Sequence, residues 1–296
     1  MAVKRWVVGC LVLLLGTIGT VSLAFLVVSL SMGTGGEGLS LSPLGHKVGL
    51  VEIVGGIDDS DPVVEQLERM RRDASVRAVV VRLDSPGGGV AASQEIYEAV
   101  RKIRDDGKPV IASMGGVAAS GAFYVACAAD SIVANPGTLT GSIGVILSFP
   151  NTEALFRKVG IKLEVVKTGK YKDVGSMWRS MTPEEQKLLE DVLNNVYDQF
   201  IDAISEGRDL DREDILPYAD GRIMSGDQAQ SYGFVDRMGD LNDAIQLAAD
   251  MGGIKGRPTV VRKEPRKPSF LEFFDQKMNQ VTGIGPHGPV LEYRLR

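Results

Sequence analysis

Histidine and cysteine are both scarce in this chain of 296 residues, which has two of each. Cys10 lies in an apolar run and Cys127 in an alanine-rich segment, and neither belongs to a Cys-x-x-Cys or Cys/His cluster. This spacing argues against a disulfide framework or a zinc motif, so we expect no metal and no cofactor. The formal net charge of −5 argues against a general nucleic-acid binder, which would present a basic face.

Charged residues are missing between Arg5 and Glu37. Residues 6–30 of this gap are mostly Val, Leu, Ile, Gly and Ala, and as a helix they exceed the ~30 Å hydrocarbon core of a bilayer. A cleaved signal peptide is the alternative, but its apolar region usually spans only ~7–15 residues. We therefore predict one uncleaved transmembrane helix in the cytoplasmic (inner) membrane. Lys4 and Arg5 place the N-terminus inside and the rest of the chain outside.

The sequence divides into four expected segments: a cytoplasmic stub with the anchor (1–32), a Gly/Ser/Pro linker (33–46), a folded domain (47–261) and a tail (262–296). The tail begins with a basic run, which is typical of a solvated linker but could also contact lipid or a partner.

Hydrophobic patterns in the folded domain alternate between strands and helices. They predict strands over 47–57, 76–89, 108–116 and 162–167, and two short strands in "DSIVANP" and "SIGVILSF". They predict helices over 60–75, with Asp61 as the N-cap and Pro62 in the first turn, and over 94–104, 118–129, 151–159 and 183–206. This alternation predicts an α/β fold with a mostly parallel sheet and flanking helices.

Two strand-to-helix junctions are rich in glycine and alanine, namely "LDSPGGGV" (83–90) and "GGVAASGAF" (115–123). Parallel sheets place ligand sites at the carboxyl ends of their strands, where such junctions lie. Free N–H groups in a glycine turn can hold the oxyanion of an acyl-transfer reaction, and Ser120 lies in the second junction. Tight packing of a small-residue helix start against a sheet would explain the same composition. The sequence alone therefore leaves Ser120 either catalytic or structural.

A catalytic Ser120 needs a base, and neither histidine is well placed to be one. His46 ends the linker and His287 lies in the glycine-rich tail, whereas a Ser-His-Asp triad needs its histidine on a rigid scaffold. Lysine is the best remaining base, although burial must lower its unperturbed pKa of ~10.4. The stretch "KTGKYKD" offers Lys167, Lys170 and Lys172, and the pattern does not choose among them.

Five motifs in order narrow the choice: "DSPGGG", "AASGAFYVA", "TGSIGVI", "GKYKD" and "ADGRIMSGDQAQSYGFVD". They resemble the signal peptide peptidase A family of membrane-anchored serine proteases, and the resemblance extends over roughly residues 47–250. The resemblance implies a Clp protease/crotonase-like fold and a serine endopeptidase that uses a Ser-Lys dyad. It also implies hydrophobic peptide substrates, such as signal peptides left in the membrane.

Site residues follow from this resemblance, position by position. Ser120 matches the nucleophile, Lys172 the general base, and Ser142 the serine that orients the lysine amine. Gly87 matches an oxyanion-hole donor, and Gly121 is a second candidate donor. One departure is Ala122, where the family often has glycine, so we expect an extra methyl group beside the substrate path.

Family members with one short catalytic region assemble into homo-oligomers in which neighbouring chains supply the two halves of each dyad. This chain has one such region, so the resemblance implies a homo-oligomer with shared dyads. Three alternatives remain: a crotonase-like acyl-transfer enzyme, a non-proteolytic membrane scaffold and a protease released by cleavage after the apolar run. The anchor argues against the first of these, and the joint presence of Ser120, Lys172 and Ser142 argues against the second.

Overall fold

The computed structural model describes residues 46–262 and 292–294, and the compact unit begins at His46. The expected anchor at residues 6–30 lies outside the described residues, as do the linker and most of the tail. Among the helices that are described, none combines the length and the apolar character needed to cross a bilayer.

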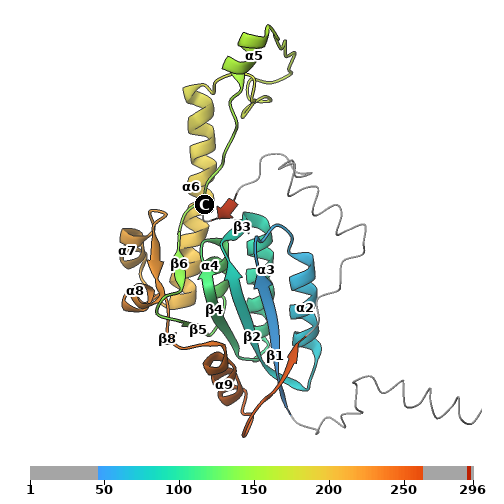
Figure 1. The fold of residues 1–296 in the computed structure, drawn as a ribbon, viewed down its shortest axis with the longest axis vertical. Coiled ribbons are helices and arrows are strands. Elements are labelled where there is room, and N and C mark those ends of the chain that lie inside the picture. Colours follow the sequence, from blue (N-terminus) through green and yellow to red (C-terminus); the bar gives the residue numbers. More distant parts are fainter. Residues whose placement is uncertain (1–45, 263–291, 295–296) are drawn as a thin grey trace, which may run out of the picture. The chain divides into compact units, whose positions relative to one another are not determined.

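A mostly parallel sheet forms the centre of the fold (Figure 1), which confirms the predicted α/β class. Its strand order is β7-β6-β4-β2-β1-β9, with β5 beside β4 and β8 beside β5. All pairs are parallel except β6 with β7. The strands are β1 (Lys47–Val54), β2 (Val76–Ser85), β4 (Val110–Ala118), β5 (Ser131–Ala134), β6 (Leu139–Gly141), β7 (Ile223–Ser225), β8 (Arg237–Met238) and β9 (Thr259–Arg262). A second, two-stranded sheet joins β3 (Gly87–Gly89) to β10 (Glu292–Arg294).

Both faces of the sheet are buried, as the apolar runs of the strands predict. In β2, Val79, Val81 and Leu83 belong to one hydrophobic cluster, whereas Ala78 and Val80 belong to the other. The first cluster includes residues of α2 (Asp61–Arg72), α3 (Val90–Asp105), α4 (Gly121–Ala126) and α6 (Pro183–Arg208). The second includes residues of α9 (Leu241–Met251). The remaining helices are α5 (Glu153–Val159), α7 (Arg212–Ile215), the 3-10 helix η1 (Leu216–Tyr218) and α8 (Gly226–Ser231).

Three local predictions need correction. The N-cap of α2 is Ser60 rather than Asp61, which is itself the first helical residue. The expected strand in "SIGVILSF" is irregular backbone apart from a single bridge residue, Ile146, and this segment lines a pocket described below. The expected strand over 162–167 is also irregular, and side chains there such as Leu163 and Val165 are exposed. An alternating pattern forms a strand only where a neighbour accepts its hydrogen bonds, and no described strand pairs with this segment.

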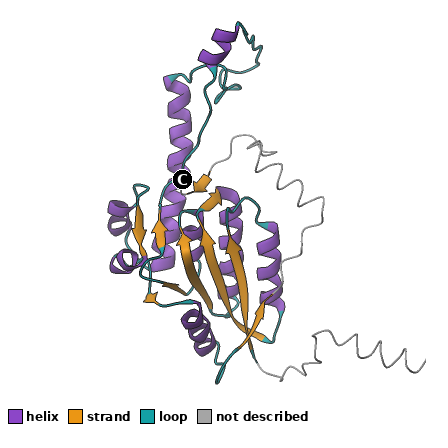
Figure 2. Ribbon diagram, in the orientation of Figure 1, coloured by secondary structure: helices purple, strands orange, loops and turns teal. Residues whose placement is uncertain are grey.

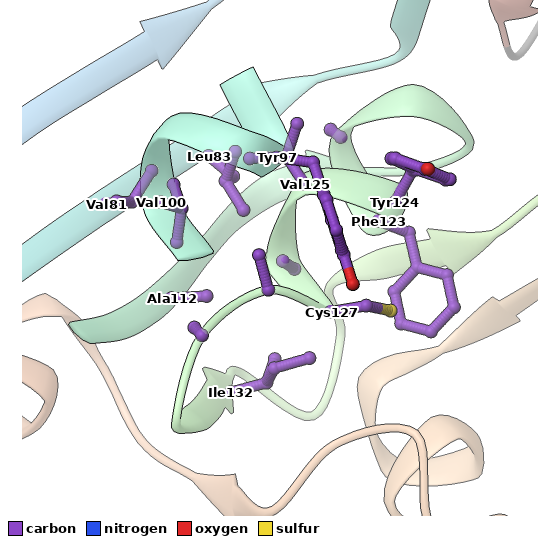
Figure 3. Close-up of a cluster of buried hydrophobic side chains, with 14 of the residues drawn as sticks. Val81, Leu83, Tyr97, Val100, Ala112, Phe123, Tyr124, Val125, Cys127 and Ile132 are labelled. Carbon is purple, nitrogen blue, oxygen red and sulfur yellow. The ribbon is translucent and has the colours of Figure 1, made fainter. Parts of the chain in front are cut away.

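The largest hydrophobic cluster lies directly behind the helix that follows Ser120 (Figure 3). Phe123, Tyr124 and Val125 of α4 are buried there, with Val81 and Leu83 of β2. Phe200 of α6 packs its ring edge-on against Tyr124, with a centroid separation of 5.2 Å. The start of α4 therefore rests on a closely packed base, which limits movement of the residue before it.

Candidate active site

Ser120 occupies a sharp turn between β4 and α4 and is almost fully buried. Its backbone has φ 55° and ψ −117°, a region that non-glycine residues rarely adopt and that costs about 1–3 kcal/mol. Its N–H donates to the Gly141 carbonyl at 2.8 Å, and the N–H of Ala119 donates to the Ser85 carbonyl at 3.1 Å. The ends of β2 and β6 thus both hold the backbone at Ser120.

Ser142 follows β6 and also has a positive φ, of 52°. Its N–H donates to the Arg222 carbonyl at 2.7 Å, which ties it to the segment before β7. Gly141 has a φ of 76°, and a Cβ atom there would lie 2.9 Å from Met224 Cε. The Thr140 hydroxyl donates to the Ala118 carbonyl at 2.7 Å, two residues before Ser120. Glycine and threonine in "TLTGS" are therefore needed to bring Ser142 beside the nucleophile turn.

Ser120 and Ser142 line the same pocket, which has a volume of about 780 Å³. Most of its other side chains are apolar: Ile143, Val145, Ile146, Leu193, Tyr197 and Ala219. Its polar lining side chains are Glu190, Asn194 and Asp220. A largely apolar cavity beside a buried, strained serine is suited to hold a hydrophobic side chain of a substrate.

Gly87 begins β3, and its N–H donates to the Ser85 hydroxyl at 3.1 Å. The Gly87 carbonyl accepts the Ile57 N–H, and the Gly89 N–H donates to the Ile57 carbonyl. Because neighbouring strand residues direct their polar groups to opposite edges, the N–H and C=O of Gly88 face away from Ile57.

The edge that Gly88 faces is occupied by β10, which pairs antiparallel with β3 and places Tyr293 opposite Gly88. A Cβ atom on Gly88 would lie 2.2 Å from the Ile57 carbonyl oxygen, so only glycine fits there. Gly88 is not among the predicted site residues, although its place in the "GGG" run was the available signal.

Gly121 is the first residue of α4 and is buried. Ala122, expected beside the substrate path, is instead fully buried in the main hydrophobic cluster. It is also absent from the described residues that line the pocket. The methyl group of Ala122 thus packs against the core, because the tight turn at Ser120 directs the next two residues inward.

Lys172 is not among the described residues that line this pocket. It is exposed and lies in a turn of the irregular segment between α5 and α6, a segment that joins α6 at the end remote from the sheet (Figures 1 and 2). Phe200 of α6 packs on α4, and about 25 Å of helix separates Phe200 from Pro183, where α6 begins. Of the described residues, Ser120 and Ser142 are therefore brought together, whereas Lys172 of the same chain is not.

Other chemistry at the site is restricted. Burial raises the pKa of the Cys127 thiol to about 12, so this cysteine is not a nucleophile at neutral pH. The described residues contain no group of three or more His, Cys, Asp or Glu side chains placed to hold a metal ion.

Family models match two overlapping parts of the chain. The model for peptidase family S49 matches residues 102–255, more than half of the sequence, and the model for Clp protease matches residues 48–138. The chain belongs to peptidase family S49. This result confirms the predicted resemblance and the Clp protease-like fold, and it makes the protein a serine peptidase.

Several similar proteins are proteases by name. A putative protease of Synechocystis is 42% identical over 210 residues, which cover 70% of this chain and 75% of the relative. Protease 4 of Salmonella typhi is 37% identical over 195 residues, 66% of this chain and 31% of that protein. A putative signal peptide peptidase SppA of Enterococcus faecium is 36% identical over 180 residues, 61% of this chain and 52% of that protein. The chain thus spans only about half of the last relative and a third of Protease 4.

The segment around Lys172 in this S49 peptidase is held by ion pairs. Asp173 accepts hydrogen bonds from Lys167 and from Arg179, and these lower the pKa of the Asp173 carboxyl well below its usual range. Arg179 also donates to Glu185, whose pKa is lowered to about 2 chiefly by that hydrogen bond. Both carboxylates therefore stay ionised at any pH at which the enzyme is expected to work.

Proposed function

We propose that this S49 peptidase is a membrane-anchored endopeptidase that cleaves residual signal peptides and other hydrophobic peptides with Ser120 as nucleophile and Lys172 as general base. The observation that carries the proposal is Ser120 itself, buried in a strained turn beside a largely apolar pocket. Strain of this kind persists only where the surrounding structure holds it, and it clusters at active sites. The relatives named as proteases support the same activity.

The reaction proceeds through an acyl-enzyme. The Ser120 hydroxyl transfers its proton to the neutral amine of Lys172 as its oxygen attacks the peptide carbonyl, and backbone N–H groups stabilise the oxyanion. Lys172 then protonates the leaving amine, and it later accepts a proton from the water that releases the acyl group. Gly87 and Gly121 are the proposed oxyanion donors. The Gly87 N–H must then leave the Ser85 hydroxyl that it contacts here, and Gly88 faces the edge where a peptide would lie.

A second copy of the chain supplies Lys172 in this proposal. Lys172 is remote from its own Ser120, and it is exposed, whereas a neutral lysine needs burial. The segment that carries it, residues 146–182, exposes several large apolar side chains: Leu155, Val159, Ile161, Leu163, Val165 and Val166. Burying this surface against a neighbouring chain would both desolvate the lysine and bring it to the neighbour's Ser142 and Ser120.

An extended peptide is the form of substrate that the glycine strand fits. The three-residue strand β10 pairs antiparallel with β3 through its backbone, immediately before α3 and beside the nucleophile turn. A substrate strand taking the same edge would gain backbone hydrogen bonds whatever its side chains, and the apolar pocket would select hydrophobic residues. The relative named as a signal peptide peptidase supports this substrate class.

Location and domain boundaries remain proposals from the sequence. Residues 6–30 would anchor the chain in the cytoplasmic membrane, with the catalytic domain outside. The proposed segments are the stub and anchor (1–32), the linker (33–46), the catalytic domain (47–261) and the tail (262–296). Such an anchor would hold the pocket close to peptides that remain in the bilayer.

The test compares the full-length wild type with Ser120→Ala and Lys172→Ala on a hydrophobic signal-peptide fragment. We expect cleavage by the wild type alone, and full activity in either variant would contradict the dyad. A lysine base acts only in its neutral form, so the wild-type rate, measured from pH 8 down to pH 5, should also fall. Asp173 and Glu185 do not titrate in that window because their pKa values are lowered, so a flat profile would count against a lysine base.

A further inference from the structure

The proposed base lies in a segment that regular secondary structure does not fix. The Lys172 N–H donates to the Gly169 carbonyl at 3.2 Å, and the Val174 N–H donates to the Tyr171 carbonyl at 3.2 Å, so the chain here makes consecutive turns. A general base must nevertheless be held within hydrogen-bond reach of the proton that it takes. Side-chain contacts must therefore set the position of this turn.

Asp173, the residue after Lys172, provides such a contact. Its carboxylate is only 15% exposed and accepts from the Arg179 Nε at 3.0 Å, and the same guanidinium also donates to the Asp173 carbonyl at 3.3 Å. Arg179 thus holds both the side chain and the backbone of the residue next to the proposed base.

The other edge of the guanidinium reaches Glu185, whose side chain is 4% exposed. Arg179 donates to its two carboxylate oxygens at 2.7 Å and 2.5 Å. Glu185 also accepts the Thr182 N–H, and the Thr182 hydroxyl accepts the Glu185 N–H, so the pair caps the start of α6. Glu185 is therefore a rigid attachment point.

Helix α6 links this attachment point to the substrate pocket, because Leu193 and Tyr197 of the same helix line it. A planar guanidinium can pair with both oxygens of one carboxylate while its Nε–H reaches a second carboxylate, a fixed geometry that the ammonium group of a flexible lysine does not reproduce. Among the described residues, Arg179 is the cation that contacts both Asp173 and Glu185, whereas Lys167 contacts Asp173 and the Lys170 carbonyl.

We infer that Arg179 is a positioning residue for catalysis, which holds the Lys172 turn to the start of α6 through Asp173 and Glu185. The inference rests on the proposed Ser-Lys mechanism, since it assigns Arg179 no contact with substrate. It predicts that loss of Arg179 lowers kcat by a larger factor than it changes KM, because Asp173, Arg179 and Glu185 are not among the described residues that line the pocket.

The experiment uses the full-length chain and the hydrophobic peptide above. Arg179→Met should lower kcat about 10- to 100-fold, the cost of misplacing a catalytic group by about 1 Å. Asp173→Asn should lower kcat similarly, and the double variant should be no worse than either alone because both changes break one bridge. Arg101→Met is the matched control: it removes an arginine paired with Glu98 and Asp105 on α3, and kcat should not change.

Assembly and melting temperature are measured for each variant, and Arg179→Lys serves as a second variant that keeps the charge but loses the bidentate pairing with Glu185. An intermediate kcat for Arg179→Lys supports the bridge. An unchanged kcat in Arg179→Met, a parallel rise in KM, or additive losses in the double variant would overturn it. If neither Arg179 variant assembles, the network serves assembly and the positioning role is rejected. Failure of the proposed Ser-Lys dyad would give a different result from failure of the Arg179 inference, because Lys172→Ala would then remain active.

Discussion

A dyad shared between chains predicts that two inactive variants restore activity when they assemble together. Ser120→Ala keeps Lys172, and Lys172→Ala keeps Ser120, so neither forms a complete site alone. The exposed Lys172 lies beyond the end of α6, about 25 Å of helix from the residue that packs on α4. A complete site within one chain would require the segment to fold back along most of that helix, whereas a neighbour needs no such change.

The activity expected of the mixed assemblies follows from a dyad that is shared between neighbouring chains. In a closed assembly with head-to-tail contacts, each site takes its serine from one chain and its lysine from the next. When the two variants are mixed at random in equal amounts, half of the sites have Ser120, and half of those have a neighbour with Lys172. Activity should therefore reach about a quarter of the wild-type value per site.

Co-expression with two different affinity tags isolates the mixed assemblies, and peptide cleavage is measured per mole of chain. The matched control replaces Lys172→Ala by the doubly substituted chain Ser120→Ala/Lys172→Ala, which provides no serine and should remain inactive. Mixed assemblies that are confirmed by both tags but cleave no faster than the separate variants would refute a shared dyad, since a dyad within one chain predicts no recovery.

Two further predictions concern the elements around the nucleophile. Thr140→Val removes the buried hydrogen bond to the Ala118 carbonyl and should cost about 1–3 kcal/mol, or about 2–10 °C in melting temperature, and it should lower kcat. Thr138→Val removes the bond to the Gly115 carbonyl, further from Ser120, and also the acceptor of the Asn135 N–H, so it should cost at least as much stability with a smaller effect on kcat; equal effects on kcat would count against the reasoning. Deletion of residues 292–296 should lower KM for the peptide because β10 occupies the edge of β3, and a higher KM would show that β10 does not compete with substrate.

Much of this fold follows from local patterns. The apolar runs at 76–85 and 110–118 are long enough to predict buried parallel strands, and the small residues at 115–123 indicate a close junction. The two segments wrongly predicted as strands, 142–149 and 162–167, have strand-like sequences, but neither belongs to a described sheet. Pairing is a property of the tertiary arrangement, and a single segment does not specify it.

In the candidate site, too, local sequence patterns indicate some residues and not others. The glycine-rich stretches indicate the turns at Gly87 and Ser120, because backbone with positive φ values favours glycine. No sequence pattern indicates the network of Asp173, Arg179 and Glu185, because charged residues at irregular spacing usually lie in solvent. Only the three-dimensional structure shows that these side chains contact one another.

In the proposed arrangement, the active site is complete only after the chains have assembled. A general base must lie within reach of the proton that it takes, whereas Lys172 of the same chain is exposed and absent from the described residues that line the pocket beside Ser120. Contact between chains would supply the base and remove water from it in the same step, because the apolar side chains around Lys172 would be buried together with it. A single dissociated chain should therefore be inactive, and this would protect neighbouring proteins until the peptidase has assembled.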